Sequence, residues 1–243
     1  MALTSWVNPS HTRPERVAAY RREFAAHPAR LIVLREFLHA DIANRVAQFL
    51  EREAEFRPVH GLSPSRTAEE FVAPEDRAAA ASEQRFFRFS EPSGVDAEFR
   101  LSPNVVAYLK IVKALEDGRF VSFAERISGL ALGSAHVNVH RMQSGDFLSP
   151  HSDAHYDRRL TFVLFLSGEW HPEFGGTLRL SDGRGGQWAI EPAFNTLAIF
   201  DIHAHEKHWV TPIEPAAGTR TRVTIGGWIA DRLQLPYSSM EIR

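Results

Sequence analysis

The chain of 243 residues contains no cysteine. This absence excludes disulfide frameworks, thiolate metal sites and cysteine nucleophiles, so any metal ion must be held by His, Asp or Glu. Long apolar runs are also missing, because no segment approaches the roughly 18 residues of a membrane span. The N-terminal stretch lacks the basic segment and apolar core of a secretory signal. We therefore expect a cytoplasmic protein without a membrane partner.

An excess of charge of one sign is lacking as well, since the formal net charge is -2. Such a balance provides no electrostatic footprint for nucleic acid, and no nucleic-acid partner is expected. What the chain does have is a hydrophobic fraction of 44%, enough for a substantial core. No linker rich in Pro, Gly or Ser divides it. The sequence therefore predicts a single domain over residues 1–243, present as a monomer or a homodimer.

The first half of the chain, residues 1–129, is predicted to be mostly helical. Apolar residues at helical spacing, with proline near the start and glycine or proline near the end, are the signals. The predicted helices span residues 14–26, 40–54, 103–117 and 120–127. Short strands are predicted at 31–34 and 84–90. Residues 57–82, which are rich in proline and alanine, are predicted to form a loop with a weak helix, and residues 91–94 a turn.

The second half has a different residue pattern, in which short runs of β-forming residues are separated by Gly, Pro, Asn and Asp. The predicted strands are 131–142, 146–151, 160–167, 176–181, 187–190, 196–201, 206–212 and 221–229. Eight short strands with this punctuation favour an antiparallel sandwich or jelly roll over a parallel α/β sheet. The sequence thus predicts an α+β fold with a mainly β core. A double-stranded β-helix, or jelly roll, over residues 130–230 would be supported by residues 1–129 and followed by a tail at 231–243.

A candidate metal site lies within residues 145–155. Alternate side chains of an extended strand share one face, so His151 and Asp153 can hold the same ion. An imidazole and a carboxylate suit first-row divalent metals, and a second histidine would complete the two-histidine, one-carboxylate triad of non-haem Fe(II) oxygenases. The H-x-D triplet alone is a weak signal, because it often arises by chance. Spacing does not choose the third ligand among His203, His205 and His208.

A second candidate group lies on the predicted strand at 221–229. The two-residue period places Arg220, Arg222 and Thr224 on one face. An arginine buried on the metal side would need a carboxylate partner, and its planar fork is suited to bind one in a bidentate pair. A dicarboxylate co-substrate would meet that need, whereas an arginine paired with a surface acid would indicate no site at all.

Residues 130–230 resemble the Fe(II)- and 2-oxoglutarate-dependent dioxygenases of the prolyl 4-hydroxylase type. Six motifs carry the resemblance in order: GDFLSPHSD (145–153), LTFVLFLSGEW (160–170), GGTLRL (175–180), EPAFNTLAIF (191–200), HWVTPI (208–213) and RVTIGGW (222–228). Six ordered motifs are far more specific than an H-x-D triplet. In that family the distal iron ligand opens an H-x-V-x-P run, so the resemblance implies His151, Asp153 and His208 as the iron ligands.

The resemblance also implies how 2-oxoglutarate is bound. The basic residue that clamps its far carboxylate lies six positions before the tryptophan of the last motif, which selects Arg222, and Thr224 can add a hydroxyl. The stretch before Arg222 is a few residues longer than in the family, so Arg220 is kept as a fallback. Relatives often have a 2-oxoglutarate-binding tyrosine where Arg141 and Met142 stand. The hydrogen bond of that tyrosine is therefore either lost here or supplied by another group, for which His140 and Asn138 are the candidates.

The activity implied by the resemblance is a hydroxylation that uses Fe(II), 2-oxoglutarate and O2. Ascorbate is expected as the reductant that restores over-oxidised iron. Asp153 favours hydroxylation, because relatives that halogenate lack this carboxylate. The expected substrate is a prolyl or other amino-acid-derived side chain in a small molecule, a peptide or a carrier-bound form, with release of succinate and CO2. The candidates for contact with an acidic group of the substrate are the turn residues His155, Tyr156, Arg158 and Arg159. The alternative is that these side chains are simply solvated.

Two other functions compete with this hypothesis. The first is a non-catalytic jelly-roll protein that binds a metal as a sensor or interaction module, which would have no need for an arginine clamp beyond the third ligand. The second is a nucleic-acid demethylase with the same iron chemistry. Such an enzyme would need a positive groove and a stacking platform, and the near-neutral charge does not support them.

Overall fold

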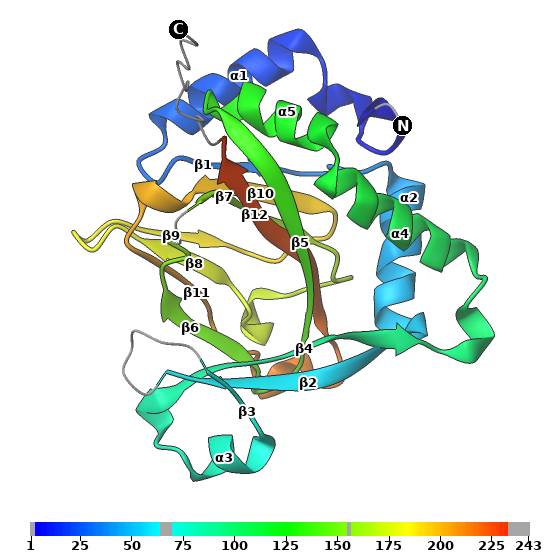
Figure 1. Ribbon diagram of the computed structural model, residues 1–243, viewed down its shortest axis with the longest axis vertical. Helices are drawn as coiled ribbons and strands as arrows, with labels where there is room; N and C mark the ends of the chain where they lie inside the picture. Colours follow the sequence, from blue (N-terminus) through cyan, green and yellow to red (C-terminus); the bar gives the residue numbers. More distant parts are fainter. Residues whose placement is uncertain (1–2, 64–69, 155–156, 233–243) are drawn as a thin grey trace, which may run out of the picture.

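The computed structural model describes residues 3–63, 70–154 and 157–232. Its strands curl into two layers that face each other, as the jelly-roll prediction requires (Figure 1). The first layer consists of β1 (Leu31–Leu34), β10 (Thr196–Asp201), β7 (Arg158–Phe165), β12 (Arg222–Asp231) and β5 (Leu132–Met142). The second consists of β6 (Phe147–His151), β11 (Lys207–Val210), β8 (Leu178–Ser181) and β9 (Gln187–Ile190). All eight strands predicted in the second half are present, and the jelly roll is confirmed.

The strand β4 (Arg85–Val95) joins the two layers, because it pairs with β5 on one layer and with β6 on the other. Two further strands, β2 (Ala54–Leu62) and β3 (Glu70–Val72), extend the sheet beyond β4. The prediction of a loop over 57–82 is therefore wrong for its first part. Pro58 is tolerated because it pairs with Ser90 at a position where β2 has no neighbour on its other side.

The turn predicted at residues 91–94 is also wrong. β4 continues through these residues to Val95, and Pro92 pairs with Phe56 of β2 beside a shift of register. Proline and glycine here mark an irregular point in a long strand, which is one of the few places where a sheet accepts them. The local sequence signal for a bulge and for a turn is the same. Only the pairing with β2 distinguishes the two.

Four helices cover the outer face of the first layer (Figure 1). They are α1 (Pro14–Ala26), α2 (Ala40–Gln48), α4 (Pro103–Glu116) and α5 (Gly118–Ser128), and a short α3 (Pro74–Ala79) lies beside β2. The α2 helix ends six residues earlier than predicted, in a π-helical turn at Phe49–Glu53. The predicted start of α4 is confirmed, since the Ser102 hydroxyl accepts a hydrogen bond from the Val105 amide. No helix of the described residues is long and apolar enough to cross a membrane.

The alternation of side chains along β12 separates two cores. Val223, Ile225 and Ile229 face the helices and belong to the larger core. Arg222 and Trp228 lie on the opposite face, between the two layers of strands. Apolar side chains from both layers, such as Phe200, form the second core there. Polar residues that point inward between the layers are therefore shielded by apolar walls on both sides.

Candidate metal centre

Three side chains that could bind a metal ion converge between the layers of strands. His151 ends β6, Asp153 follows two residues later, and His208 lies on β11. Because β6 and β11 are antiparallel neighbours, His151 and His208 are direct partners in the register. One ligand atom from each of the three residues lies within 4.8 Å of the others. This is the combination that the H-x-D triplet and the H-x-V-x-P run indicate.

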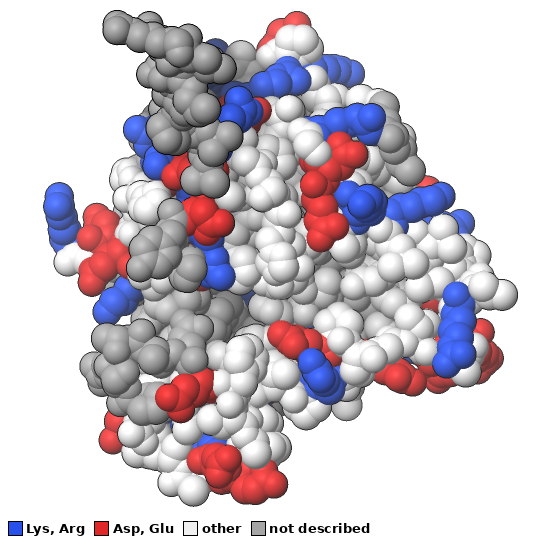
Figure 2. Space-filling model, viewed as in Figure 1, with Lys and Arg blue, Asp and Glu red and all other residues white. Residues whose placement is uncertain are grey.

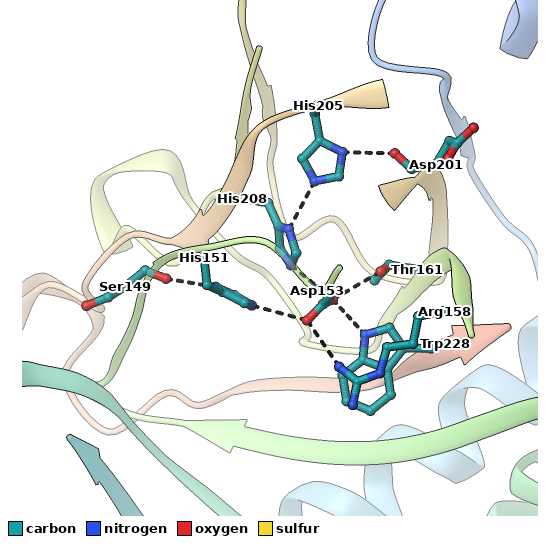
Figure 3. Close-up of polar contacts among 9 residues, drawn as sticks. All are labelled: Ser149, His151, Asp153, Arg158, Thr161, Asp201, His205, His208 and Trp228. Carbon is teal, nitrogen blue, oxygen red and sulfur yellow. Dashed lines mark hydrogen bonds and ion pairs between the residues drawn. The ribbon is translucent and has the colours of Figure 1, made fainter. Parts of the chain in front are cut away.

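Both histidines present their Nε2 atoms to the carboxylate. The His151 Nδ1 is 2.8 Å from the carbonyl oxygen of Ser149, which can only accept a hydrogen bond, so this nitrogen carries the proton. Nε2 of His151 lies 3.5 Å from Oδ1 of Asp153, and Nε2 of His208 lies 3.2 Å from Oδ2 (Figure 3). Two imidazole nitrogens and one carboxylate oxygen on one side of an ion form the donor set that Fe(II) sites use.

The protonation states also suit a metal. Burial lowers the pKa of His208 to about 4, so this imidazole is neutral at pH 7. Burial alone would raise the pKa of Asp153, but its close contacts with His151 and His208 outweigh burial and hold that pKa well below the usual range. A neutral imidazole and an ionised carboxylate are the forms that bind metal ions.

Asp153 is oriented by three further residues. The indole Nε1 of Trp228 donates a hydrogen bond of 2.6 Å to Oδ2, and the Thr161 hydroxyl donates one of 3.1 Å to the same oxygen. Arg158 lies 3.6 Å from Oδ1 and stacks on the Trp228 ring at 3.6 Å (Figure 3). Neither Trp228 nor Thr161 was predicted to have a role in the site. The only available signal was the strand period that puts both on inner faces, because their pairing depends on the register between β7 and β12.

Arg222 is the arginine that is buried between the layers of strands. It is 3% exposed, donates a hydrogen bond of 2.8 Å to the carbonyl of Gly176, and lies over the Phe165 ring. Burial lowers its pKa to about 9. No carboxylate of the described residues forms an ion pair with it. Arg220, by contrast, is exposed before the start of β12, with its guanidinium over Phe174.

The remaining 2-oxoglutarate candidates lie next to Arg222 on the inner face of the first layer. Thr224 is 4% exposed and pairs with His140 of β5, while Asn138 pairs with Gly226. His140 stacks against Phe89, and burial together with the charge of Arg222 lowers its pKa to about 4. His140 is therefore neutral at pH 7 and can exchange hydrogen bonds with an anion in the same space.

The other candidate residues are placed as follows. His203 is exposed, and His205 lies behind His208 rather than beside Asp153. Arg159 forms an ion pair of 3.0 Å with the buried Asp201. Of the expected substrate contacts, His155 and Tyr156 lie outside the described residues.

Comparison with known proteins agrees with this geometry. Residues 137–230 match the family model of the 2OG-Fe(II) oxygenase superfamily, and all the residues of the triad lie in that range. These residues form a 2OG-Fe(II) oxygenase domain. The resemblance drawn from the six motifs is thereby confirmed. The family implies Fe(II), 2-oxoglutarate and O2 as cofactors, and the triad of this oxygenase domain has the donor atoms to hold the iron.

The oxygenase domain has relatives of known type. The prolyl 3-hydroxylase OGFOD1 of Mus musculus is 27% identical over 140 residues, which are 55% of this chain and 25% of that protein. The chain spans about a quarter of the length of the curated relatives it matches. A Pseudomonas putida prolyl-4-hydroxylase structure superposes with a TM-score of 0.55 and 19% identity over 89% of this chain and 100% of its own. The structure of a Trichoplax adhaerens prolyl hydroxylase in complex with a hypoxia inducible factor peptide superposes with a TM-score of 0.55 and 15% identity. This match covers 90% of this chain and 94% of the other. At these identities the structures show a shared fold.

Proposed function

We propose that the protein is a dioxygenase that hydroxylates a prolyl or other amino-acid-derived side chain and releases succinate and CO2. The observation that carries this proposal is the burial of Arg222 without an ion pair to any carboxylate of the described residues. A buried guanidinium without a carboxylate partner is costly, and a dicarboxylate co-substrate removes that cost. A protein that only binds a metal has no need for such a residue. The alternative of a non-catalytic metal-binding module is therefore the weaker one.

In this mechanism the chain's own residues bind and orient the reactants. His151, Asp153 and His208 would hold the iron, and Arg222 with Thr224 would bind the far carboxylate of 2-oxoglutarate. When bound, Fe(II) supplies the coupling of 2-oxoglutarate decarboxylation to the oxidation of a substrate C–H bond. The apolar side chains that line the space between the layers exclude water, which strengthens the ion pair with Arg222.

The substrate class is inferred from the relatives and from the residues beside the metal site. The curated relative is a prolyl 3-hydroxylase, and the structural neighbours reported above are prolyl hydroxylases. Arg158 has a side chain 32% exposed and lies against Trp228 and Asp153, so its remaining donors can reach a substrate carbonyl or carboxylate next to the iron. Arg159 is engaged by Asp201 and is the weaker candidate.

Further parts of the proposal concern the surroundings of the enzyme. Acidic and basic side chains are interspersed on the face shown in Figure 2, which supports a peptide or small-molecule substrate over a nucleic acid. We also propose a cytoplasmic location, a monomeric or homodimeric state, and ascorbate as the reductant that maintains the iron. The absence of cysteine and the near-neutral net charge support the cytoplasmic location.

The test is an anaerobic titration of the Fe(II)-loaded protein with 2-oxoglutarate, followed by the weak visible charge-transfer band of a chelated keto acid. We expect a saturable band in the wild type and in Arg220→Ala, and none over the same range in Arg222→Ala. Absence of the band in the wild type, with iron demonstrably bound, would favour the metal-binding module. Equal bands in Arg222→Ala and the wild type would transfer the clamp to another residue.

A further inference from the structure

A buried histidine lies behind the metal ligand His208. His205 follows the 3-10 turn Ile202–Ala204 and is 8% exposed. Its Nδ1 lies 2.9 Å from the backbone carbonyl oxygen of Asp201, and its Nε2 lies 3.1 Å from Nδ1 of His208 (Figure 3). The three residues thus form a chain of two hydrogen bonds that ends at the candidate metal centre.

The chemistry of these groups determines where each proton lies. A carbonyl oxygen only accepts hydrogen bonds, so Nδ1 of His205 carries the proton and Nε2 is left as an acceptor. The hydrogen bond between the two rings must therefore be donated by Nδ1 of His208. It follows that Nε2 of neutral His208 has a lone pair, and this is the atom 3.2 Å from Oδ2 of Asp153. The chain selects the tautomer of His208 that binds a metal.

The anchor of this chain is itself rigid. Asp201 is 3% exposed, its carboxylate accepts hydrogen bonds of 3.0 Å from Arg159 and from the amide of His203, and its own amide donates to the carbonyl of Arg30. The Phe200 ring stands edge-on to both His205 and His208 at 5.3 Å between ring centroids. A rotation of the His205 ring would break both hydrogen bonds, and the Phe200 ring beside it offers no replacement.

The two histidine ligands differ in how they are oriented. His151 donates to a backbone carbonyl, which no substitution removes, whereas His208 donates to a side chain. We propose that His205 is a positioning residue of the metal centre, which fixes the tautomer and the ring orientation of His208. This role rests on the proposed metal centre and deepens it. Outer partners of metal-bound histidines typically change metal affinity by about 10- to 100-fold when removed.

The test measures Mn(II) binding to the metal-free full-length protein by isothermal titration calorimetry. His205→Ala is expected to weaken binding by about 10- to 100-fold. His205→Gln places an amide oxygen that can accept the His208 proton and should restore part of the affinity. His203→Ala is the matched control, because His203 is an exposed histidine on the same turn, and it should change the affinity by less than about 2-fold.

Two further measurements separate positioning from a general loss of structure. The metal-free unfolding temperature of His205→Gln should match that of the wild type. Nitrogen-15 NMR of labelled histidine should show His208 protonated on Nδ1 in the wild type and in His205→Gln, and a mixture of tautomers in His205→Ala. Equal Mn(II) affinity in His205→Ala and the wild type overturns the proposal. So does a loss of affinity explained by a lower metal-free stability in both His205 variants.

Failure of the proposed function gives a different result. If the wild type itself binds no Mn(II), the metal centre is wrong and the role of His205 is overturned together with it. If the wild type binds Mn(II) and His205→Ala binds it equally well, the metal centre stands and only the positioning role is lost.

Discussion

At the scale of single residues, the site depends on the hydrogen bonds that orient its metal-binding side chains. Oδ2 of Asp153 receives two hydrogen bonds, from Trp228 and Thr161, on the side away from the histidines. These bonds hold the carboxylate in one orientation, so that its remaining lone pairs face the histidine nitrogens. Arg222 is in the opposite situation, because its guanidinium is buried while no carboxylate of the described residues pairs with it.

The first prediction concerns Trp228. Replacing it by phenylalanine keeps a ring for Arg158 to stack on but removes the hydrogen bond of 2.6 Å to Asp153. We expect Mn(II) affinity to fall by about 10-fold with little change in the fold. Trp170→Phe is the control, because the Trp170 indole donates a similar bond of 2.9 Å to the Gly175 carbonyl and takes no part in the triad. Equal affinities in the two variants would mean that the bond to Asp153 does not orient the ligand.

A second prediction separates function from stability at Arg222. In the absence of 2-oxoglutarate, burial disfavours the charged guanidinium in the folded state, which is why its pKa falls to about 9. Arg222→Met has a similar volume and no charge, so it should make the apoprotein more stable by about 1 kcal/mol or more. Urea unfolding of both proteins, with and without 2-oxoglutarate, measures this. The co-substrate should stabilise the wild type and leave the variant unchanged. A less stable apo variant would show that the hydrogen bond to Gly176 outweighs the buried charge.

At the scale of elements, a buried acid joins the π-helical turn after α2 to the start of α4. Glu53, in the π-helical turn, is 4% exposed and accepts hydrogen bonds of 2.5 Å from Ser102 and from Asn104, at the start of α4. The α4 helix then packs against β5, the strand that carries the 2-oxoglutarate candidates. Along α4, Leu109 is 58% exposed, whereas Ile111 and Leu115 are buried.

A third prediction follows for this attachment. Glu53→Ala leaves the buried amide of Asn104 without its acceptor, and should lower the free energy of unfolding by about 2 to 4 kcal/mol. Glu55→Ala, an exposed glutamate two residues later, should change it by less than about 0.5 kcal/mol. Urea denaturation of the metal-free proteins measures both values. Similar losses in the two variants would contradict the role assigned to Glu53.

For the whole molecule, histidines whose pKa is lowered in the folded state contribute to how stability depends on pH. Burial lowers the pKa of His11, and it lowers that of His140 and of His208 to about 4. The unfolded chain has histidines with ordinary pKa values near 6.5, so it binds more protons than the folded state between about pH 4 and about pH 6.5. Each such histidine therefore stabilises the fold above this range, and its contribution is lost as the pH falls through it.

The fourth prediction is a fall in metal-free stability on acidification within this range. Between about pH 7 and about pH 5, His140 alone should account for about 1 to 2 kcal/mol. In His140→Asn, urea unfolding should show a smaller loss between the two pH values than in the wild type. His203→Asn, at an exposed position, should behave as the wild type. An unchanged pH dependence in His140→Asn would show that this side chain does not titrate on unfolding.

Much of the site could be read from local patterns. The two-residue period of a strand was enough to place Arg222 with Thr224, because it depends only on backbone geometry within one strand. It also placed His151 with Asp153, although β6 ends at His151 and Asp153 lies just beyond the strand. The turn residues of the second half delimited its eight strands for the same local reason. The motifs then ranked His208 above its neighbours, and the structure brings that residue to the other two ligands.

Tertiary structure alone decided which distant segments meet. The pairing of His151 with His208 and of Trp228 with Thr161 depends on registers between strands separated by dozens of residues. Local sequence determines the face that a side chain occupies, but not its partner across a sheet, which depends on the packing of the whole core. The same holds for Arg222, whose burial without a carboxylate needs both layers of strands, and for His205, whose place behind His208 comes from the turn after β10.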